Sequence, residues 1–235
     1  MSKLIIHVTD ILSSLDDLQL DLISSNLELI DVDVTLASSI YGSNDDISAE
    51  NFLRCYNHLR LALRALENNY DLVLIDCPPN FYALVKNAIT ASDYYIVPSK
   101  LDYLSKLGVD HLDKSVKKYI EEYNVKREVY IKNNPDYEAE YQGVATDILG
   151  IVPTMVDVWR GDKLMANCSR FYSHLQEKNY YLFQWIRNNS NFFGVDPVQA
   201  GPAVLRTTET VTDAHQKIIK ELQELGQEFM TRAGI

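Results

Sequence analysis

A short apolar run followed by an acidic residue and two prolines constrains the fold more than any other feature of this sequence. Residues 70–80 read Tyr-Asp-Leu-Val-Leu-Ile-Asp-Cys-Pro-Pro-Asn. An apolar run without polar alternation is typical of a strand covered on both faces, which favours a parallel sheet. Pro78 and Pro79 lack backbone donors and predict a stiff, extended exit. Asp76 is therefore expected at the carboxyl end of a strand, where open α/β sheets bind ligands.

The rest of the chain alternates helix-like and strand-like patterns around this run. Apolar residues recur every three or four positions from Phe52 to Leu66, which predicts an amphipathic helix with Ser48 as its cap. Further helices are predicted at 8–20, 81–91, 107–123, 164–177 and 212–231, and short strands or turns at 20–23, 27–34, 94–98, 147–154 and 181–186. This order predicts an α/β fold, a doubly wound, mostly parallel sheet with helices on both faces, in a single domain over residues 1–235.

Composition excludes several classes of function. The chain of 235 residues has a formal net charge of -11 and a pI near 4.9, which argues against broad binding of DNA phosphates. Its three cysteines lie far apart, without the spacing of a zinc site or a disulfide scaffold. The sequence contains no run of roughly 18 uncharged apolar residues that could span a membrane. We therefore expect a cytoplasmic protein with no membrane span.

The run at 71–79 is similar to the Walker B segment of the ParA/MinD family of partition ATPases. That family carries an apolar run followed by Asp-Cys-Pro-Pro or Asp-Thr-Pro-Pro. The resemblance continues in order along the chain, at Leu20–Leu29, Asn87–Pro98, Leu149–Asp157 and Gly201–Leu205. It implies a P-loop NTPase-like fold, binding of ATP and Mg²⁺, and an ATP-dependent dimer switch in plasmid or chromosome segregation.

The same resemblance implies a set of site residues and partners. Asp76 would serve the nucleotide-bound magnesium with Pro78 beside it, and Thr154 and Met155 would lie in the base-side loop. Arg187 stands where the family often has Ile-Pro-Arg near the base, although a simple surface arginine is an equal alternative. The implied partners are a homodimer or a full-length homologue, a ParB-like adaptor and non-specific DNA, the last of which the acidic charge does not support.

One defining feature of the family is missing from this sequence. None of the nine glycines belongs to a Gly-x-x-x-x-Gly-Lys-(Ser/Thr) loop, whose backbone N–H groups would cradle phosphate. We therefore expect an N-terminally truncated relative, and the alternative to an ATPase is a non-enzymatic interaction or regulatory module. Asp31 and Asp33 could be taken for the family's second aspartate motif, but the Pro-Gln expected after it is absent. A polar strand edge or turn is the favoured interpretation there.

Overall fold

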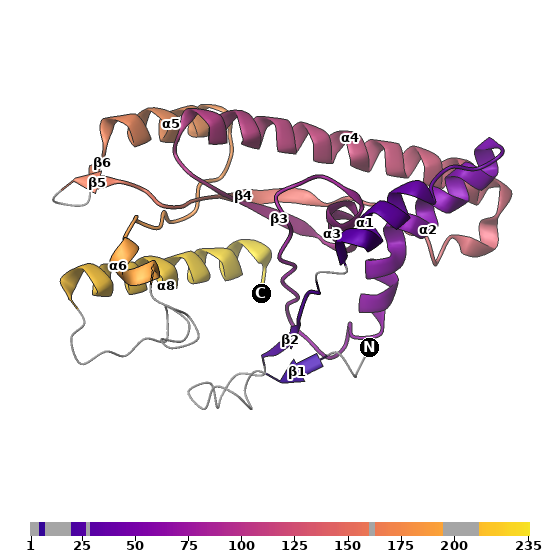
Figure 1. Cartoon of the computed structure of the whole chain (residues 1–235), viewed down its shortest axis with the longest axis horizontal. Helices are drawn as coiled ribbons and strands as arrows, with labels where there is room; N and C mark the ends of the chain where they lie inside the picture. The colour runs from indigo at the N-terminus through magenta and orange to yellow at the C-terminus, as the bar shows by residue number, and fades with distance from the viewer. Residues whose placement is uncertain (1–4, 8–19, 27–28, 160–162, 195–211) are drawn as a thin grey trace. The chain divides into compact units, whose positions relative to one another are not determined.

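The computed structural model describes residues 5–7, 20–26, 29–159, 163–194 and 212–235 (Figure 1). It divides the chain into two compact units. The first unit comprises Met1–Asp93 and Lys118–Thr146, and the second comprises Tyr94–Lys117 and Asp147–Ile235. The expected single domain of residues 1–235 stays a prediction, and we describe each unit by itself.

The first unit is mainly helical. β1 (Ile5–His7) pairs antiparallel with β2 (Asp21–Ile23), and these strands precede α1 (Leu29–Ser38), α2 (Asp45–Arg64) and α3 (Ala83–Ala91). The unit also contains the second half of α4 (Tyr103–Asn133) and the short 3₁₀ helix η4 (Pro135–Tyr137). α2 begins earlier than predicted because Asn44, not Ser48, is its cap and accepts a hydrogen bond from the Ile47 N–H at 2.8 Å.

Buried side-chain hydrogen bonds join the helices of the first unit. The amide of Asn87 on α3 donates to the Cys55 carbonyl at 2.9 Å and accepts from the Leu59 N–H at 3.3 Å, both on α2. Asn57 on α2 donates to the Tyr123 hydroxyl on α4 at 2.5 Å. Because buried polar groups are costly unless they are paired, these bonds fix how the three helices pack.

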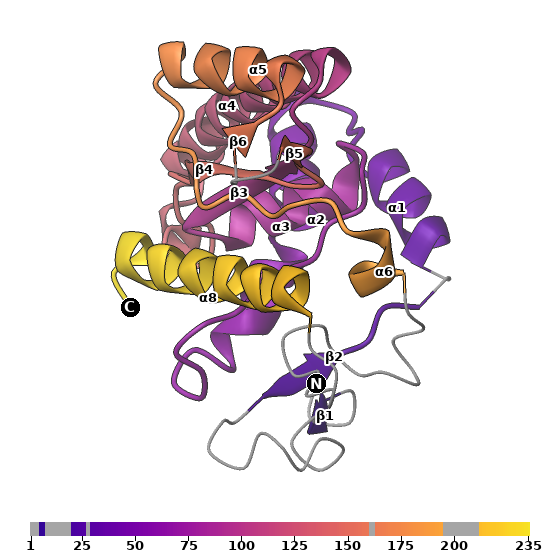
Figure 2. The same ribbon diagram turned by 90° about the vertical axis from the view of Figure 1, so that its left-hand side faces the viewer.

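The second unit contains the parallel part of the sheet. β3 (Tyr94–Ser99) and β4 (Asp147–Pro153) are parallel neighbours, and parallel bridges at Leu182 and Arg187 place the following extended segment, residues 181–187, on the other side of β4. α5 (Ala166–Glu177) and the first half of α4 cover one face, and α8 (Asp213–Ala233) covers the opposite face (Figure 2). The predicted α/β class with helices on both faces of a parallel sheet is confirmed.

Three small elements complete the second unit. β5 (Val158–Trp159) and β6 (Lys163–Leu164) form an antiparallel pair that sequence patterns did not predict, and α6 (Ser190–Phe193) is a single turn. None of the described helices is long and apolar enough to cross a membrane.

A bulge in β4 keeps its apolar residues on the correct faces. The register with β3 shifts by one residue, because Tyr95 pairs with Ile148 whereas Ile96 pairs with Gly150. A side chain at Gly150 would place its Cβ 2.7 Å from the Phe183 ring and 2.8 Å from the Tyr181 carbonyl oxygen. Glycine at this position therefore allows segment 181–187 to approach β4 closely.

α8 also covers the outer side of segment 181–187. The N–H groups of Gln184 and Arg187 donate to Glu228 at 2.8 Å and Glu221 at 3.1 Å, both carboxylates of α8. Arg232, one turn beyond Glu228, donates to the Leu149 carbonyl at 3.1 Å. The helix thus satisfies backbone groups that an edge strand would otherwise expose.

Two predicted strands are wrong. Residues 70–75 form no strand, and Leu72, Val73 and Leu74 are 37%, 48% and 73% exposed, so the expected coverage on both faces is absent. Residues 27–34 were expected to be strand or turn, but α1 occupies 29–38, where Asp33 bonds α3 instead of a neighbouring strand. The helix predicted at 8–20 falls almost wholly outside the described residues, and the stretch 201–205 lies outside them altogether.

Candidate functional site

The carboxyl ends of β3, β4 and segment 181–187 meet in the second unit. The Thr154 N–H donates to the Ser99 carbonyl at the end of β3 at 2.8 Å. Two residues later, the Val156 N–H donates to the Ile186 carbonyl at 3.0 Å, and Val156 forms a parallel bridge with Arg187. The structure therefore brings three of the five predicted site residues, Thr154, Met155 and Arg187, to the end of the sheet where α/β proteins bind ligands.

Met155 has an unusual backbone conformation at this position. Its φ of 51° lies in the left-handed region, which residues other than glycine seldom adopt. The hydrogen bonds of Thr154 and Val156 on either side hold it there. The Met155 side chain is 58% exposed, so the strained turn presents it to the solvent.

Arg187 is an anchored residue and not a simple surface arginine. Its Nε and Nη2 atoms donate to Oε1 of Glu221 at 2.8 and 2.6 Å, and both side chains are largely buried. A buried pair of this kind needs both partners, because removal of one leaves an uncompensated charge. The guanidinium is therefore engaged in binding α8, which corrects the surface alternative. A contact of Arg187 with a nucleotide base stays a prediction.

Asp76 and Pro78 belong to the first unit, whereas Thr154, Met155 and Arg187 belong to the second. Both are exposed, and Asp76 lies in an extended segment that belongs to no strand. The Pro78 carbonyl accepts the Asn80 N–H at 2.8 Å, which turns the chain at Pro79. The expectation that a strand end would hold Asp76 in place is thus wrong in this structure.

The described residues supply only part of a site for Mg²⁺ and nucleotide. Among them, no group of three His, Cys, Asp or Glu side chains could hold a metal ion. A single carboxylate such as Asp76 is nevertheless a normal Mg²⁺ ligand when phosphates and water complete the octahedron. The sequence contains no Gly-x-x-x-x-Gly-Lys-(Ser/Thr) pattern, and the lack of a phosphate loop stays a prediction.

Asp33 has a structural task that the sequence did not reveal. Its Oδ1 atom accepts a hydrogen bond from the Leu84 N–H at 2.9 Å, in the first turn of α3. The N-cap residue of α3 makes no side-chain capping bond. The Asp33 carboxylate on α1 therefore accepts the Leu84 N–H, and its negative charge interacts favourably with the positive end of the α3 dipole. The interpretation of residues 31–33 as a second catalytic aspartate motif is not needed to explain Asp33.

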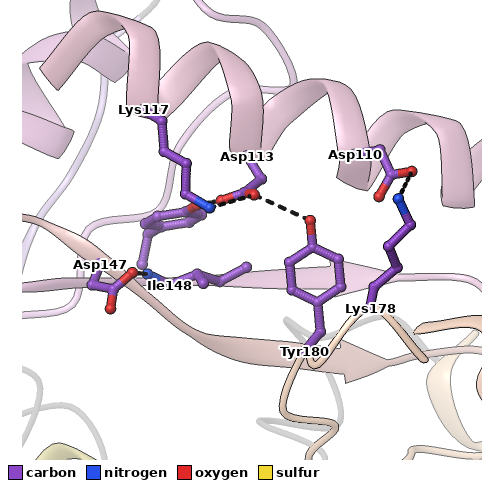
Figure 3. A network of polar contacts seen from close by, with 8 residues as sticks. Asp110, Asp113, Lys117, Asp147, Ile148, Lys178 and Tyr180 are labelled. Atoms are coloured by element: carbon purple, nitrogen blue, oxygen red, sulfur yellow. Dashed lines mark hydrogen bonds and ion pairs between the residues drawn. The ribbon is translucent and has the colours of Figure 1, made fainter. Parts of the chain in front are cut away.

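A polar network in the second unit was missed by the sequence analysis (Figure 3). Asp113 on α4 accepts hydrogen bonds from Lys117 at 2.9 Å, from Tyr95 on β3 at 2.9 Å and from Tyr180 at 3.1 Å. Beside it, Lys178 forms an ion pair with Asp110 at 3.7 Å. Burial alone would raise the pKa of the Asp113 carboxyl, but these donors outweigh it and hold that pKa below its usual range.

The same network changes the acidity of its tyrosines. Burial, the charge of Asp113 and the hydrogen bond to it together raise the pKa of Tyr180 to about 12. The sequence showed a high tyrosine content, 15 residues, but no local pattern connects Tyr180 with its acceptor Asp113, 67 positions earlier. The network fixes α4 and the turn after α5 on β3, and no reaction is assigned to it.

A family model described as an AAA domain matches residues 3–129, more than half of the chain. Among curated proteins, the sporulation initiation inhibitor protein Soj of Bacillus subtilis is 35% identical over 92 residues. The chain belongs to the ParA family of AAA-domain partition ATPases. The Soj match covers 39% of this chain and about a third, 34%, of Soj. The cell division protein PomZ of Myxococcus xanthus is 29% identical over 65% of this chain and 43% of PomZ.

Solved structures support the fold of this ParA family member. Apo McdA from Cyanothece matches over 89% of this chain and 68% of its own length, with a TM-score of 0.56 at 15% identity. A plasmid partition protein from Borrelia burgdorferi matches over 96% of this chain and 66% of its own length, with a TM-score of 0.51 at 18% identity. At such low identity these matches establish the fold alone.

Proposed function

We propose that this chain forms part of an ATP-dependent dimer switch of the ParA type that acts in plasmid or chromosome segregation. The observation that carries the proposal is the Asp-Cys-Pro-Pro segment at 76–79 within a member of the ParA family. In this proposal Asp76 supplies a carboxylate to the Mg²⁺ of ATP. The loop at Thr154 and Met155 supports it because it lies at the carboxyl end of β4.

No hydrolysis step is assigned to the chain by itself. Phosphoryl transfer depends on positioning and on neutralising phosphate charge, and no phosphate loop is found in the sequence. The proposed partners are a second copy or a full-length homologue and a ParB-like adaptor, in the cytoplasm. The net charge of -11 gives no support to broad DNA binding by this chain.

A second candidate function is a non-enzymatic interaction module. It is favoured by the segment 70–75, an apolar stretch that is exposed and in no described strand. Such a segment can add to the sheet of a partner through its backbone N–H and C=O groups. Asp76 would then have no metal to hold.

Calorimetric titration with ATP and Mg²⁺ of both the chain and a fusion that adds a phosphate loop separates the two functions. We expect no saturable binding in the sub-millimolar range for the 235-residue chain, because one exposed carboxylate gives little affinity without a phosphate cradle. A fusion that adds the phosphate loop of a homologue should bind and hydrolyse ATP. Tight Mg²⁺-dependent binding by the unfused chain would show that other residues form the cradle.

The fusion also tests the role of Asp76. Asp76→Ala should abolish hydrolysis in the fusion and leave the far-UV circular dichroism spectrum unchanged, since Asp76 is exposed. Asp71→Ala is the matched control, because Asp71 is an exposed carboxylate of the same segment, five residues earlier. Full turnover by the Asp76→Ala fusion would remove Asp76 from the site and favour the interaction module.

A further inference from the structure

Three aromatic rings of the first unit surround the ammonium group of Lys86. The Nζ atom lies 5.2 Å from the ring centroid of Tyr56 on α2, 5.4 Å from that of Tyr119 on α4 and 5.9 Å from that of Phe81. We call these three rings the Lys86 cage. All three distances fall within the range of cation–π attraction, about 6 Å.

Lys86 has no conventional partner among the described residues. No carboxylate or other hydrogen-bond acceptor of the described part of the chain lies within bonding distance of its Nζ atom. Lys178 and Lys117, by contrast, each bond an aspartate. The second lysine of the first unit that lies over a ring, Lys126, has one ring only, Phe52, at 5.3 Å. The Lys86 cage is therefore an ammonium site built from aromatic faces.

The cage is rigid and electrically neutral. Tyr56 and Tyr119 are 4% and 2% exposed, and their rings meet edge to face at 5.4 Å. The Tyr119 hydroxyl shares a hydrogen bond of 2.5 Å with Thr90, which fixes the ring. Burial raises the pKa of both phenols above the ordinary range, so neither becomes an anion at neutral pH. The rings attract a cation through their π faces and not through an ion pair.

The position of Phe81 connects the cage to the predicted metal segment. Phe81 follows Asn80 directly, and its ring meets that of Tyr119 edge to face at 6.3 Å. Pro78 and Pro79 restrict the backbone between Phe81 and Asp76. A displacement of Phe81 therefore passes through a short, stiff piece of chain to Asp76.

We propose that the Lys86 cage is a binding site for alkylammonium groups, that the side chain of Lys86 is its resident ligand, and that its occupation positions the segment 76–80. The last part rests on the proposed role of Asp76 in metal binding. The site itself does not, because it is defined by an ammonium group and three rings. The ligand class is a primary, methylated or quaternary ammonium, whose charge and apolar carbons both suit aromatic faces.

Hydrogen exchange measures occupation of the cage without any nucleotide. The amides of Tyr82 and Leu84 are suitable reporters, because they donate to Asn80 at 3.1 Å and Asp33 at 2.9 Å. Lys86→Ala should speed their exchange about tenfold, the loss expected for a partly desolvated cation–π site. Lys86→Arg should stay within about threefold of the parent, because guanidinium also binds aromatic faces. Lys126→Ala, which removes a cation from a single ring, should leave both amides unchanged.

Chemical rescue identifies the ligand. Tetramethylammonium chloride should restore slow exchange in Lys86→Ala, whereas sodium chloride at the same concentration should not. Neither salt should affect Lys126→Ala differently from the parent protein. Equal exchange in Lys86→Ala and the parent, or equal effects of the two salts, would overturn the proposal. The two proposals can fail separately. If tetramethylammonium restores slow exchange in Lys86→Ala but the phosphate-loop fusion does not hydrolyse ATP, the cage is retained and only the proposed role of Asp76 is lost.

Discussion

The two edges of the sheet in the second unit differ in how their backbone groups are bonded. On one side, Glu221 and Glu228 of α8 accept the outward N–H groups of segment 181–187. On the other side, no described strand pairs with β3 at the edge away from β4. Tyr94 and Ile96 on that strand are 48% and 39% exposed.

This difference shows how an edge becomes closed. α8 covers segment 181–187 with both apolar contacts and carboxylates, so the edge offers few free donors to another chain. No described strand pairs with β3 on the side away from β4, so that edge keeps the capacity to accept a strand.

Glu221→Ala should be the most destabilising change at the covered edge. It removes the carboxylate that bonds the buried Arg187 guanidinium and the acceptor of the Arg187 N–H, at a cost of about 3–5 kcal/mol in the free energy of unfolding. Urea denaturation measures the loss. Glu224→Ala is the control on the same helix, since Glu224 is 41% exposed and forms an ion pair with the exposed Lys220 at 3.5 Å. Equal stability of the two variants would mean that α8 does not close this edge.

Gly150→Ala should separate segment 181–187 from β4. The new Cβ would lie within 3 Å of both the Phe183 ring and the Tyr181 carbonyl, and we expect a loss of about 2 kcal/mol. Gly226→Ala on α8 is the opposite control, because no atom lies within 4 Å of the added Cβ. That change should stabilise the helix by up to about 1 kcal/mol. Thermal unfolding should show a lower melting temperature for Gly150→Ala and a higher one for Gly226→Ala. A change of the same sign in both variants would contradict the close packing at Gly150.

Asp113→Asn should loosen β3 on its helix-covered face and change the pH dependence of stability. The folded-state pKa of Asp113 is lowered, so its stabilisation is present above the unfolded pKa of about 3.9 and disappears as pH falls through the folded value. At neutral pH the variant should lose about 2 kcal/mol, since three donors bond this carboxylate. The difference between variant and parent should shrink in acid. A pH-independent difference would exclude the carboxylate charge as its cause.

Ile96→Lys addresses the open edge and should have the smallest effect on stability, within about 0.5 kcal/mol. Ile96 is 39% exposed, and a charge on an edge strand discourages pairing with another chain. Light scattering should show less self-association for the variant than for the parent. Severe destabilisation would mean that this side of β3 is covered in solution.

The sequence predicted elements with strong local signals and failed where a distant partner decides the structure. The spacing of Phe52, Tyr56 and their neighbours was sufficient for α2, because an amphipathic helix is visible within one segment. Residues 70–75 have the composition of a buried strand, but a strand forms only when neighbours accept its backbone groups. The sequence does not show those neighbours.

The candidate site was predictable only in part for the same reason. Thr154 and Met155 were placed correctly beyond β4, since they directly follow a recognisable strand. The role of Arg187 depends on Glu221, 34 positions later, and no local pattern connects the two. The Lys86 cage likewise draws its rings from positions 56, 81 and 119, so its existence follows from helix packing alone.

The left-handed turn at Met155 sets the direction in which that side chain leaves the backbone. For residues other than glycine this conformation costs roughly 1–2 kcal/mol, which the hydrogen bonds of Thr154 and Val156 must offset. A glycine there would remove the cost and also the side chain. The backbone therefore sets the direction of the Cα–Cβ bond of Met155, and its exposed, flexible side chain projects from this end of the sheet, where a bound molecule can contact it.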